Sequence, residues 1–184
     1  KQTALAKAYA EGRVAAIPVG DAMAYTDGAS RGNPGDAGSG TSLSIKGETC
    51  HRLDYFEPLG KATNNCAELW AIGVALSLLP RLPREGRPYN LHILTDSEYS
   101  IGCIEGGFST KVNKLLVRSI RKLMKKLVDD KILGVLSFVW VPGHADLEGN
   151  ERADLLANFG ADGSAAGRVC DMVLAMDQAF FIPD

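Results

Sequence analysis

The chain has 184 residues, of which 46% are hydrophobic and 23% are charged. This composition is sufficient for one sizeable core, and it excludes a disordered or collagen-like chain. The formal net charge of -2 excludes a protein that is basic over its whole surface, although it remains compatible with a local basic patch.

The cysteine pattern bears on the compartment in which the protein works. The four cysteines lie far apart and show no Cys-x-x-Cys spacing: Cys50, Cys66, Cys103 and Cys170. This favours free, mostly buried thiols over a zinc site or a disulfide framework. We therefore expect an intracellular, reducing compartment, without distinguishing cytoplasm, nucleus and organelle.

The ends of the chain and its hydropathy give two further expectations. There is no secretory signal and no apolar run long enough to span a bilayer, so no membrane partner is predicted. Because the chain begins at Lys1 rather than Met, it is expected to be a processed product or a piece of a longer protein.

In chain order, residues 1–20 are rich in alanine with interspersed charges, which predicts a short helix and a linker. We expect this segment to be an appendage to a domain over residues 21–162. Three strands then follow in an antiparallel meander separated by turn-forming residues. Their expected bounds are residues 22–26, 40–45 and 49–56.

The second half of the domain alternates helices and strands, and residues 163–184 are expected to form a tail. The expected elements are a helix over 64–79, a strand that ends at Asp96, helices over 97–104 and 111–130, a strand over 136–141 and a last helix. Trp70 and Trp140 are expected in the core. The order of elements indicates a mixed α/β fold without an internal repeat.

The stretch MAYTDGASRGNPG changes from apolar to turn-forming residues at Asp27. Such residues favour hairpin connections, so Asp27 taken alone fits an ordinary strand end. A Walker-type phosphate loop is excluded, because no Lys followed by Ser or Thr comes after the last glycine.

Asp27 ends the first expected strand, and Asp96 ends the fourth. If these strands lie side by side and parallel, both carboxylates emerge at the edge of the sheet where crevices form in α/β proteins. Two ionised carboxylates at close range raise each other's pKa unless a cation lies between them. A divalent metal ion is therefore the natural explanation for such a pair.

Other polar residues have both a structural and a functional interpretation. Glu68 is the third residue after Asn65, which would make the two a capping box. Asp154, early in the last helix, fits a partner of the helix dipole, and His144 fits a surface histidine in a Pro-Gly-His loop. For each residue alone, both interpretations stay open.

A more specific signal comes from four local sequences in a fixed order: YTDGASRGNPG, TNNCAELWAIGVAL, ILTDSEYS and WVPGHADLEGNERADLLA. Together they resemble ribonuclease H of type 1 over residues 22–162. The resemblance implies an α/β fold with a five-stranded mixed sheet in the order 3-2-1-4-5 flanked by helices. It also implies an endonuclease that cuts the RNA strand of RNA/DNA hybrids, leaving 5′-phosphate and 3′-hydroxyl ends.

The resemblance also implies the catalytic residues. Asp27, Glu68, Asp96 and Asp154 would bind two Mg²⁺ ions, with Mn²⁺ as an alternative metal. In a two-metal mechanism, one ion activates the attacking water and the other stabilises the leaving oxygen. His144 matches the family histidine that assists proton transfer or product release.

Other family positions bind the hybrid. Asn33, Asn64 and Asn65 match residues that sense 2′-hydroxyl groups in the minor groove. Glu98 stands where some relatives have Gln, and an ionised carboxylate accepts hydrogen bonds but cannot donate them. One contact with the nucleic acid is therefore expected to differ here.

A DNA phosphate would be held by Thr63 and Asn65 with Lys61, which replaces an Arg found in many relatives. Lysine lacks the bidentate geometry of arginine, so this pocket is expected to be weaker. Many cellular members also insert a basic helix where this chain has only residues 105–110. A basic row on the long helix either substitutes for it or is a solvated face: Arg118, Arg121, Lys122, Lys125 and Lys126.

Three settings remain open for such a domain. It is a free-standing ribonuclease H, the ribonuclease H domain of a reverse transcriptase polyprotein, or a binding module in a larger ribonucleoprotein. The four intact carboxylates favour an enzyme, because a retired site has no energetic reason to retain charges that repel one another.

Overall fold

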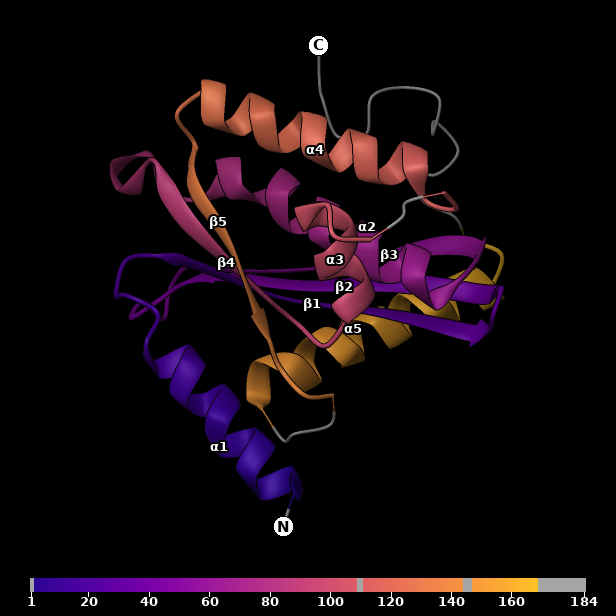
Figure 1. Ribbon diagram of the computed structural model, residues 1–184. Coiled ribbons are helices and arrows are strands. Elements are labelled where there is room, and N and C mark those ends of the chain that lie inside the picture. Colours follow the sequence, from indigo (N-terminus) through magenta and orange to yellow (C-terminus); the bar gives the residue numbers. More distant parts are fainter. Residues whose placement is uncertain (1, 109–110, 144–146, 169–184) are drawn as a thin grey trace.

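The computed structural model describes residues 2–108, 111–143 and 147–168. In these residues a five-stranded sheet carries helices on both faces (Figure 1). The elements are α1 (Gln2–Ala15), β1 (Ala22–Gly32), β2 (Gly35–Ile45), β3 (Arg52–Ala62), α2 (Asn64–Leu78), β4 (Tyr89–Thr95), α3 (Glu98–Glu105), α4 (Lys114–Asp129), β5 (Leu133–Trp140) and α5 (Glu148–Ala165). Two short 3-10 turns, Leu79–Arg81 and Arg84–Gly86, join α2 to β4.

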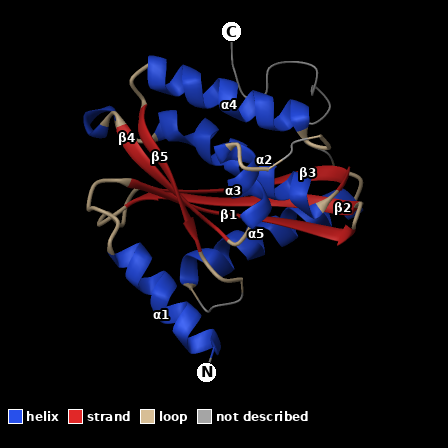
Figure 2. Cartoon of the chain, in the orientation of Figure 1, coloured by secondary structure: helices blue, strands red, loops and turns tan. Residues whose placement is uncertain are grey.

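The strand order β3-β2-β1-β4-β5 confirms the expected mixed sheet. β1 pairs antiparallel with β2, and β2 pairs antiparallel with β3. On its other side β1 pairs parallel with β4, which in turn pairs parallel with β5. The central strand β1 is therefore the point at which antiparallel pairing, with β2, gives way to parallel pairing, with β4 (Figure 2).

The first two strands are longer than the sequence predicted. β1 continues to Gly32 and β2 begins at Gly35, so the expectation that Asp27 ends the first strand is wrong. Asp27 instead pairs with Gly40 inside the hairpin. A Cβ on Gly40 would lie 2.2 Å from the Ala153 carbonyl oxygen, so this glycine allows α5 to approach the sheet rather than forming a turn.

The helices form two layers. α2, α3 and α4 lie on one face of the sheet, and α1 and α5 lie on the other (Figures 1 and 2). α2 is buried between the sheet and α4, and its Leu69, Ile72 and Leu76 are fully buried. In the described part of the chain, no helix combines the length and the hydropathy of a membrane span.

The two tryptophans differ from each other in burial. Trp70 is 1% exposed, as expected, and its indole nitrogen donates to the Glu57 carboxylate. Trp140 is 39% exposed, so the prediction that it lies in the core is wrong. It ends β5, the outermost strand of the sheet in the described residues, and its indole nitrogen donates to the Asp96 carbonyl oxygen at 3.2 Å.

The N-terminal segment packs against the sheet. Ala10 of α1 and Ile17 of the following linker join an apolar cluster with residues of β1, β4, β5 and the start of α5: Met23, Leu94, Val139, Val141 and Leu147. Lys46 also donates to the Val14 carbonyl oxygen at 3.2 Å. At the other end of the domain, α5 runs past residue 162, where the sequence placed the boundary, to Ala165.

This packing predicts different effects for two substitutions in α1. Ala10→Glu should lower the free energy of unfolding by about 2–3 kcal/mol, because it overpacks a fully buried position and buries a charge. The matched control Ala8→Glu changes an exposed residue of the same helix and should have little effect. Equal urea midpoints for both variants would contradict the packing of α1.

Candidate active site

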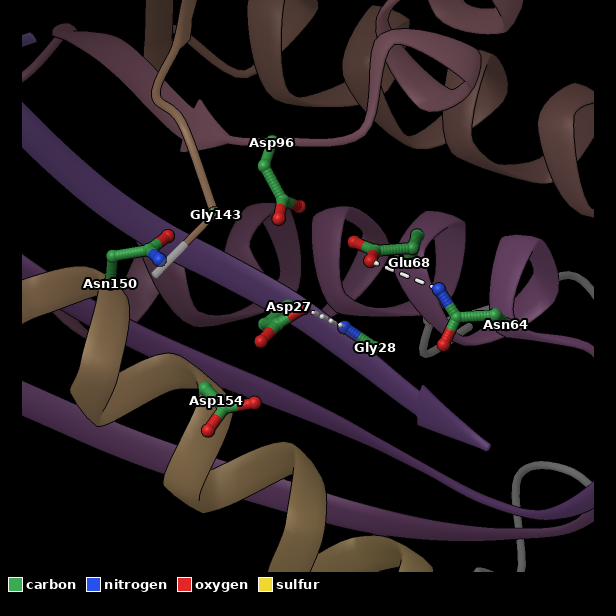
Figure 3. Close-up of a pocket in the computed structure, with 8 residues that line it drawn as sticks. All are labelled: Asp27, Gly28, Asn64, Glu68, Asp96, Gly143, Asn150 and Asp154. Atoms are coloured by element: carbon green, nitrogen blue, oxygen red, sulfur yellow. Dashed lines mark hydrogen bonds between the residues drawn. The ribbon is translucent and has the colours of Figure 1, made fainter. Parts of the chain in front are cut away.

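Acidic residues gather where β1 and β4 diverge. The parallel pairing runs from Ala22 with Leu91 to Tyr25 with Leu94, and the same register extended by two residues sets Asp27 beside Asp96. β4 then ends, whereas β1 continues along β2. The resulting cleft of about 200 Å³ is lined by Asp27, Gly28, Asn64, Glu68, Asp96, Gly143, Asn150 and Asp154 (Figure 3).

Glu68 reaches this cleft from α2. The helix is capped by Thr63, whose hydroxyl accepts a hydrogen bond from the Cys66 backbone nitrogen at 3.2 Å. The capping box between Asn65 and Glu68 is therefore wrong, because the cap lies two residues earlier than that interpretation needs. Glu68 is 4% exposed and points toward Asp27, and Asn64 donates to its Oε1 at 3.5 Å (Figure 3).

A glycine brings Glu68 close to Asp27. A Cβ on Gly28 would lie 2.4 Å from the Glu68 backbone nitrogen and 2.8 Å from the Ala67 Cβ. The first turns of α2 therefore rest directly on the backbone of β1. The Gly28 nitrogen also donates to the Asp27 Oδ1 at 2.8 Å, which fixes the direction of that carboxylate.

The three central carboxyl groups fit a divalent cation. Oxygen atoms of Asp27, Glu68 and Asp96 all lie within 4.8 Å of one another. The Glu68 Oε2 atom is buried, and no residue in the described ranges forms a hydrogen bond with it. Burying an unsatisfied polar oxygen costs free energy, and Mg²⁺ favours carboxylate oxygen ligands. A bound cation would satisfy this atom and offset the repulsion.

Burial and mutual repulsion raise the pKa values of these groups. Burial raises the pKa of Asp27 to about 7, assisted by the charges of Asp96 and Asp154 and opposed by the hydrogen bond from Gly28. Burial also raises the pKa of Glu68 well above its usual range, with further contributions from Asp27 and Asp96. Protons therefore compete with a metal ion for the site, and metal affinity should increase with pH.

Asp154 lines the cleft from the opposite side. It lies in the second turn of α5, which begins at Glu148, and so beyond the N-terminal turn where a helix-dipole partner acts. Asn158 donates to its Oδ1 at 3.1 Å. Asp154 does not belong to the group of three carboxylates within 4.8 Å. The expected His144 lies outside the described residues, next to Gly143, which lines the cleft.

Three lining residues were not singled out from the sequence. Asn150 is 6% exposed and lies one helical turn before Asp154, so the four-residue spacing could have indicated it. A Cβ on Gly143 would lie 2.5 Å from the Asp96 Oδ2. Gly28 and Gly143 gave no separate signal, because glycine at a loop or strand end is usually explained by a turn.

The asparagines expected to sense 2′-hydroxyl groups lie at the rim of the cleft. Asn33, Asn64 and Asn65 are exposed, and Asn64 lines the cleft. The Asn64 backbone nitrogen donates to the Asn33 side-chain oxygen at 3.2 Å, which joins the β1–β2 turn to the start of α2. Glu98 is exposed in the first turn of α3 and does not line the cleft.

The expected phosphate pocket and basic row already have internal contacts. Lys61 forms an ion pair with Asp36 at 2.9 Å. In the basic row, Arg121 donates to the Cys103 carbonyl oxygen at 2.8 Å. Lys125 and Lys126 form ion pairs with acidic residues one turn later, at the end and at the C-cap of α4: Asp129 and Asp130. These pairs favour a solvated helix face for that part of the row.

Fold and site together define an α/β protein with a mixed sheet and a carboxylate-lined cleft that could hold metal ions where the parallel strands β1 and β4 diverge. The RNase H family model matches residues 20–162, which leaves α1 outside the match. A ribonuclease H from Methylobacillus flagellatus is 40% identical over 145 residues, 75% of this chain and 89% of the relative. The chain belongs to the RNase H family.

Solved structures agree with this assignment. RNase H1 from the halophilic archaeon Halobacterium salinarum is 32% identical with a TM-score of 0.60, covering 77% of this chain and 98% of the relative. LC11-RNase H1, solved in complex with an RNA/DNA hybrid, is 29% identical with a TM-score of 0.63. That comparison covers 79% of this chain and 99% of the relative.

The close approach at Gly28 predicts a specific loss. Gly28→Ala should push α2 away from β1, lowering the free energy of unfolding by about 2 kcal/mol or more and weakening Mg²⁺ binding. Gly12→Ala is the matched control, since a Cβ there meets nothing within 4 Å in α1 and alanine favours a helix. Calorimetric Mg²⁺ titration of both variants measures the difference. Unchanged Mg²⁺ affinity in Gly28→Ala would contradict this role of the glycine.

The raised pKa values predict how metal-free stability depends on pH. Through Asp27, the folded protein binds more protons than the unfolded chain from about pH 4 to about pH 7. The stabilisation from protonating Asp27 is therefore present below about pH 4 and is lost as the pH rises through about 7, and the raised pKa of Glu68 acts in the same direction. Added Mg²⁺ should restore stability mainly at the upper end of this range.

Asp27→Asn tests this prediction in the presence of a chelator. It should raise the free energy of unfolding at about pH 7.5 by about 1–2 kcal/mol, because it removes a charge that repels two others. Asp129→Asn, an exposed control on α4, should leave the pH dependence unchanged. The prediction fails if the wild type and Asp27→Asn lose the same stability between about pH 5.5 and 7.5.

Proposed function

We propose that this protein is an endonuclease that hydrolyses the RNA strand of RNA/DNA hybrids, leaving 5′-phosphate and 3′-hydroxyl ends. The observation that carries this proposal is the cluster of Asp27, Glu68 and Asp96 in the cleft of an RNase H family fold. The structure of LC11-RNase H1 in complex with an RNA/DNA hybrid supports the substrate class.

Two Mg²⁺ ions are the proposed cofactor, and Mn²⁺ is an alternative. Asp27, Glu68 and Asp96 would hold them, and Asp154 would complete the ligand set from the opposite side of the cleft. When bound, the ions supply an activated water and stabilise the charge that develops on the leaving oxygen. The raised pKa values of Asp27 and Glu68 fit groups that bind metal in exchange for protons.

Recognition of the RNA strand is assigned to the asparagines at the rim. Asn33, Asn64 and Asn65 are exposed beside the cleft, where their amides can donate to and accept from a 2′-hydroxyl group. Asn64 also donates to Glu68. The sensing of the ribose would thus be coupled to the orientation of a carboxylate in the metal site.

The DNA strand would be held nearby. The Thr63 oxygen accepts a hydrogen bond as the cap of α2, but its hydroxyl hydrogen can still be donated to a phosphate. Lys61 is 72% exposed in its pair with Asp36, and a surface pair of this kind is weak enough for a phosphate to compete. Glu98 remains a candidate contact to the hybrid, and His144 a candidate for proton transfer or product release.

Cleavage of a strand-labelled RNA/DNA hybrid with Mg²⁺ tests the proposed function. Asp96→Asn should reduce cleavage by about 100-fold or more, because a loss of about 3 kcal/mol of transition-state stabilisation corresponds to that factor. The control Asp129→Asn alters an exposed acid on α4 and should cleave at the wild-type rate. Cleavage of the DNA strand, or equal rates for Asp96→Asn and wild type, would overturn the proposal.

A setting inside a larger assembly is the second candidate, either a reverse transcriptase or a ribonucleoprotein. It is favoured by Asp129 and Asp130, which lie beside the basic row and lower the net positive charge that this face can offer to a hybrid. Binding of Mg²⁺ without cleavage of a free hybrid would support it. The free thiols of Cys66 and Cys103 support the proposed intracellular, reducing compartment.

A further inference from the structure

A second set of metal-ligand side chains lies in the turn between β2 and β3. It consists of Glu48, Cys50 and His51, at the end of the sheet where Ala22 pairs with Ile45. Asp27 pairs five positions further along β1, so this turn is separate from the carboxylate cleft. None of the roles assigned to the RNase H site uses these three residues.

The three side chains turn toward one another. The Cys50 Sγ lies 3.3 Å from the His51 Nδ1, which in turn lies 2.5 Å from the Glu48 Oε2. One ligand atom from each residue falls within 4.8 Å of the other two. A small widening of the imidazole–carboxylate contact would let one ion bind both atoms, with the neutral imidazole carrying its proton on Nε2.

The backbone fixes both ends of this turn. The Glu48 nitrogen donates to the Ile45 carbonyl oxygen at 3.1 Å, and Arg52 pairs with Ser44 at the start of β3. Lys46 is tied to the linker after α1, because its nitrogen donates to the Asp21 carbonyl oxygen at 2.9 Å. The ligands therefore lie on a short segment between anchored residues, which lowers the entropy cost of binding an ion.

The donor set selects the kind of metal. A thiolate, an imidazole and a carboxylate on one ion suit Zn²⁺, whereas Mg²⁺ takes oxygen ligands. Three protein ligands with water in the fourth position are a regular zinc arrangement. The side chains of His51 and Glu48 are 44% and 42% exposed, so the ion and its water can reach the site.

We propose that Glu48, Cys50 and His51 form a second metal site, which binds one Zn²⁺ ion through the Cys50 thiolate, the His51 imidazole and the Glu48 carboxylate. Binding replaces the thiol proton of Cys50, which is released to solvent. The site does not need a Cys-x-x-Cys pattern, because its three ligands come from a single turn. Its bound ion would fasten the β2–β3 turn, which is already joined to the linker after α1.

Cobalt absorption distinguishes this site from the carboxylate cleft, because only a thiolate ligand gives a sulfur-to-cobalt charge-transfer band. Wild-type protein titrated with Co²⁺ should develop this band in the near ultraviolet, and Zn²⁺ should displace it. Asp96→Asn, altered in the other site, should keep the band. Cys50→Ser should abolish it, and His51→Ala should weaken Co²⁺ binding by more than about 10-fold.

Two further measurements keep the result interpretable. In the presence of a chelator, the unfolding temperatures of wild type, Cys50→Ser and His51→Ala should be equal. The Cys50 and His51 side chains are exposed, so both variants should remain folded. Adding Zn²⁺ should then raise the unfolding temperature of Asp96→Asn, but not that of the double variant Asp96→Asn with Cys50→Ser. The absence of a band in wild type, or its persistence in Cys50→Ser, would overturn the proposal.

Discussion

Repulsion among buried carboxylates is the interaction on which the rest of the structure depends. Asp27, Glu68 and Asp96 are held with oxygen atoms within 4.8 Å of one another, although burial and mutual repulsion raise the pKa values of Asp27 and Glu68. Such an arrangement persists only when surrounding structure is strong enough to oppose the strain. A bound cation turns the net repulsion at this site into net attraction, because the negative carboxylates then coordinate the same positive ion.

The opposing force comes from rigid packing on both faces of the sheet. On one side, α2 rests on the backbone of β1 at Gly28, and its Leu69 and Ile72 are fully buried. On the other side, α5 approaches β2 at Gly40 and carries Asp154 to the cleft. Because these contacts involve backbone atoms, neither helix can retreat from the sheet without losing much of the core. The destabilised site is thus supported by close packing of helices on both faces of the sheet.

Substrate contacts are distributed differently. The rim asparagines are exposed and joined to the metal site through Asn64, whereas the cations of α4 are partly paired within the protein. Under the proposed function, recognition of the ribose would lie close to the chemistry, and general attraction to phosphates would be weak. Weak attraction to phosphates would agree with the net charge of -2.

The sequence by itself determined the mixed α/β order and the helix after Thr63, because hydrophobic periodicity is a property of short segments. The resemblance of its four motifs to ribonuclease H also indicated the four acidic residues that line the cleft. It misjudged the length of β1 and the exposure of Trp140, which depend on how the strands pair, and it placed the cap of α2 two residues late, although Thr63 caps that helix through a local hydrogen bond. In a sequence, a glycine in a turn looks the same as a glycine beneath a helix. The roles of Gly28 and Gly40 are therefore evident only from the packing of α2 and α5 on the sheet. Tertiary structure alone decided which carboxylates meet, since their separation is set by strand register and helix docking rather than by spacing along the chain.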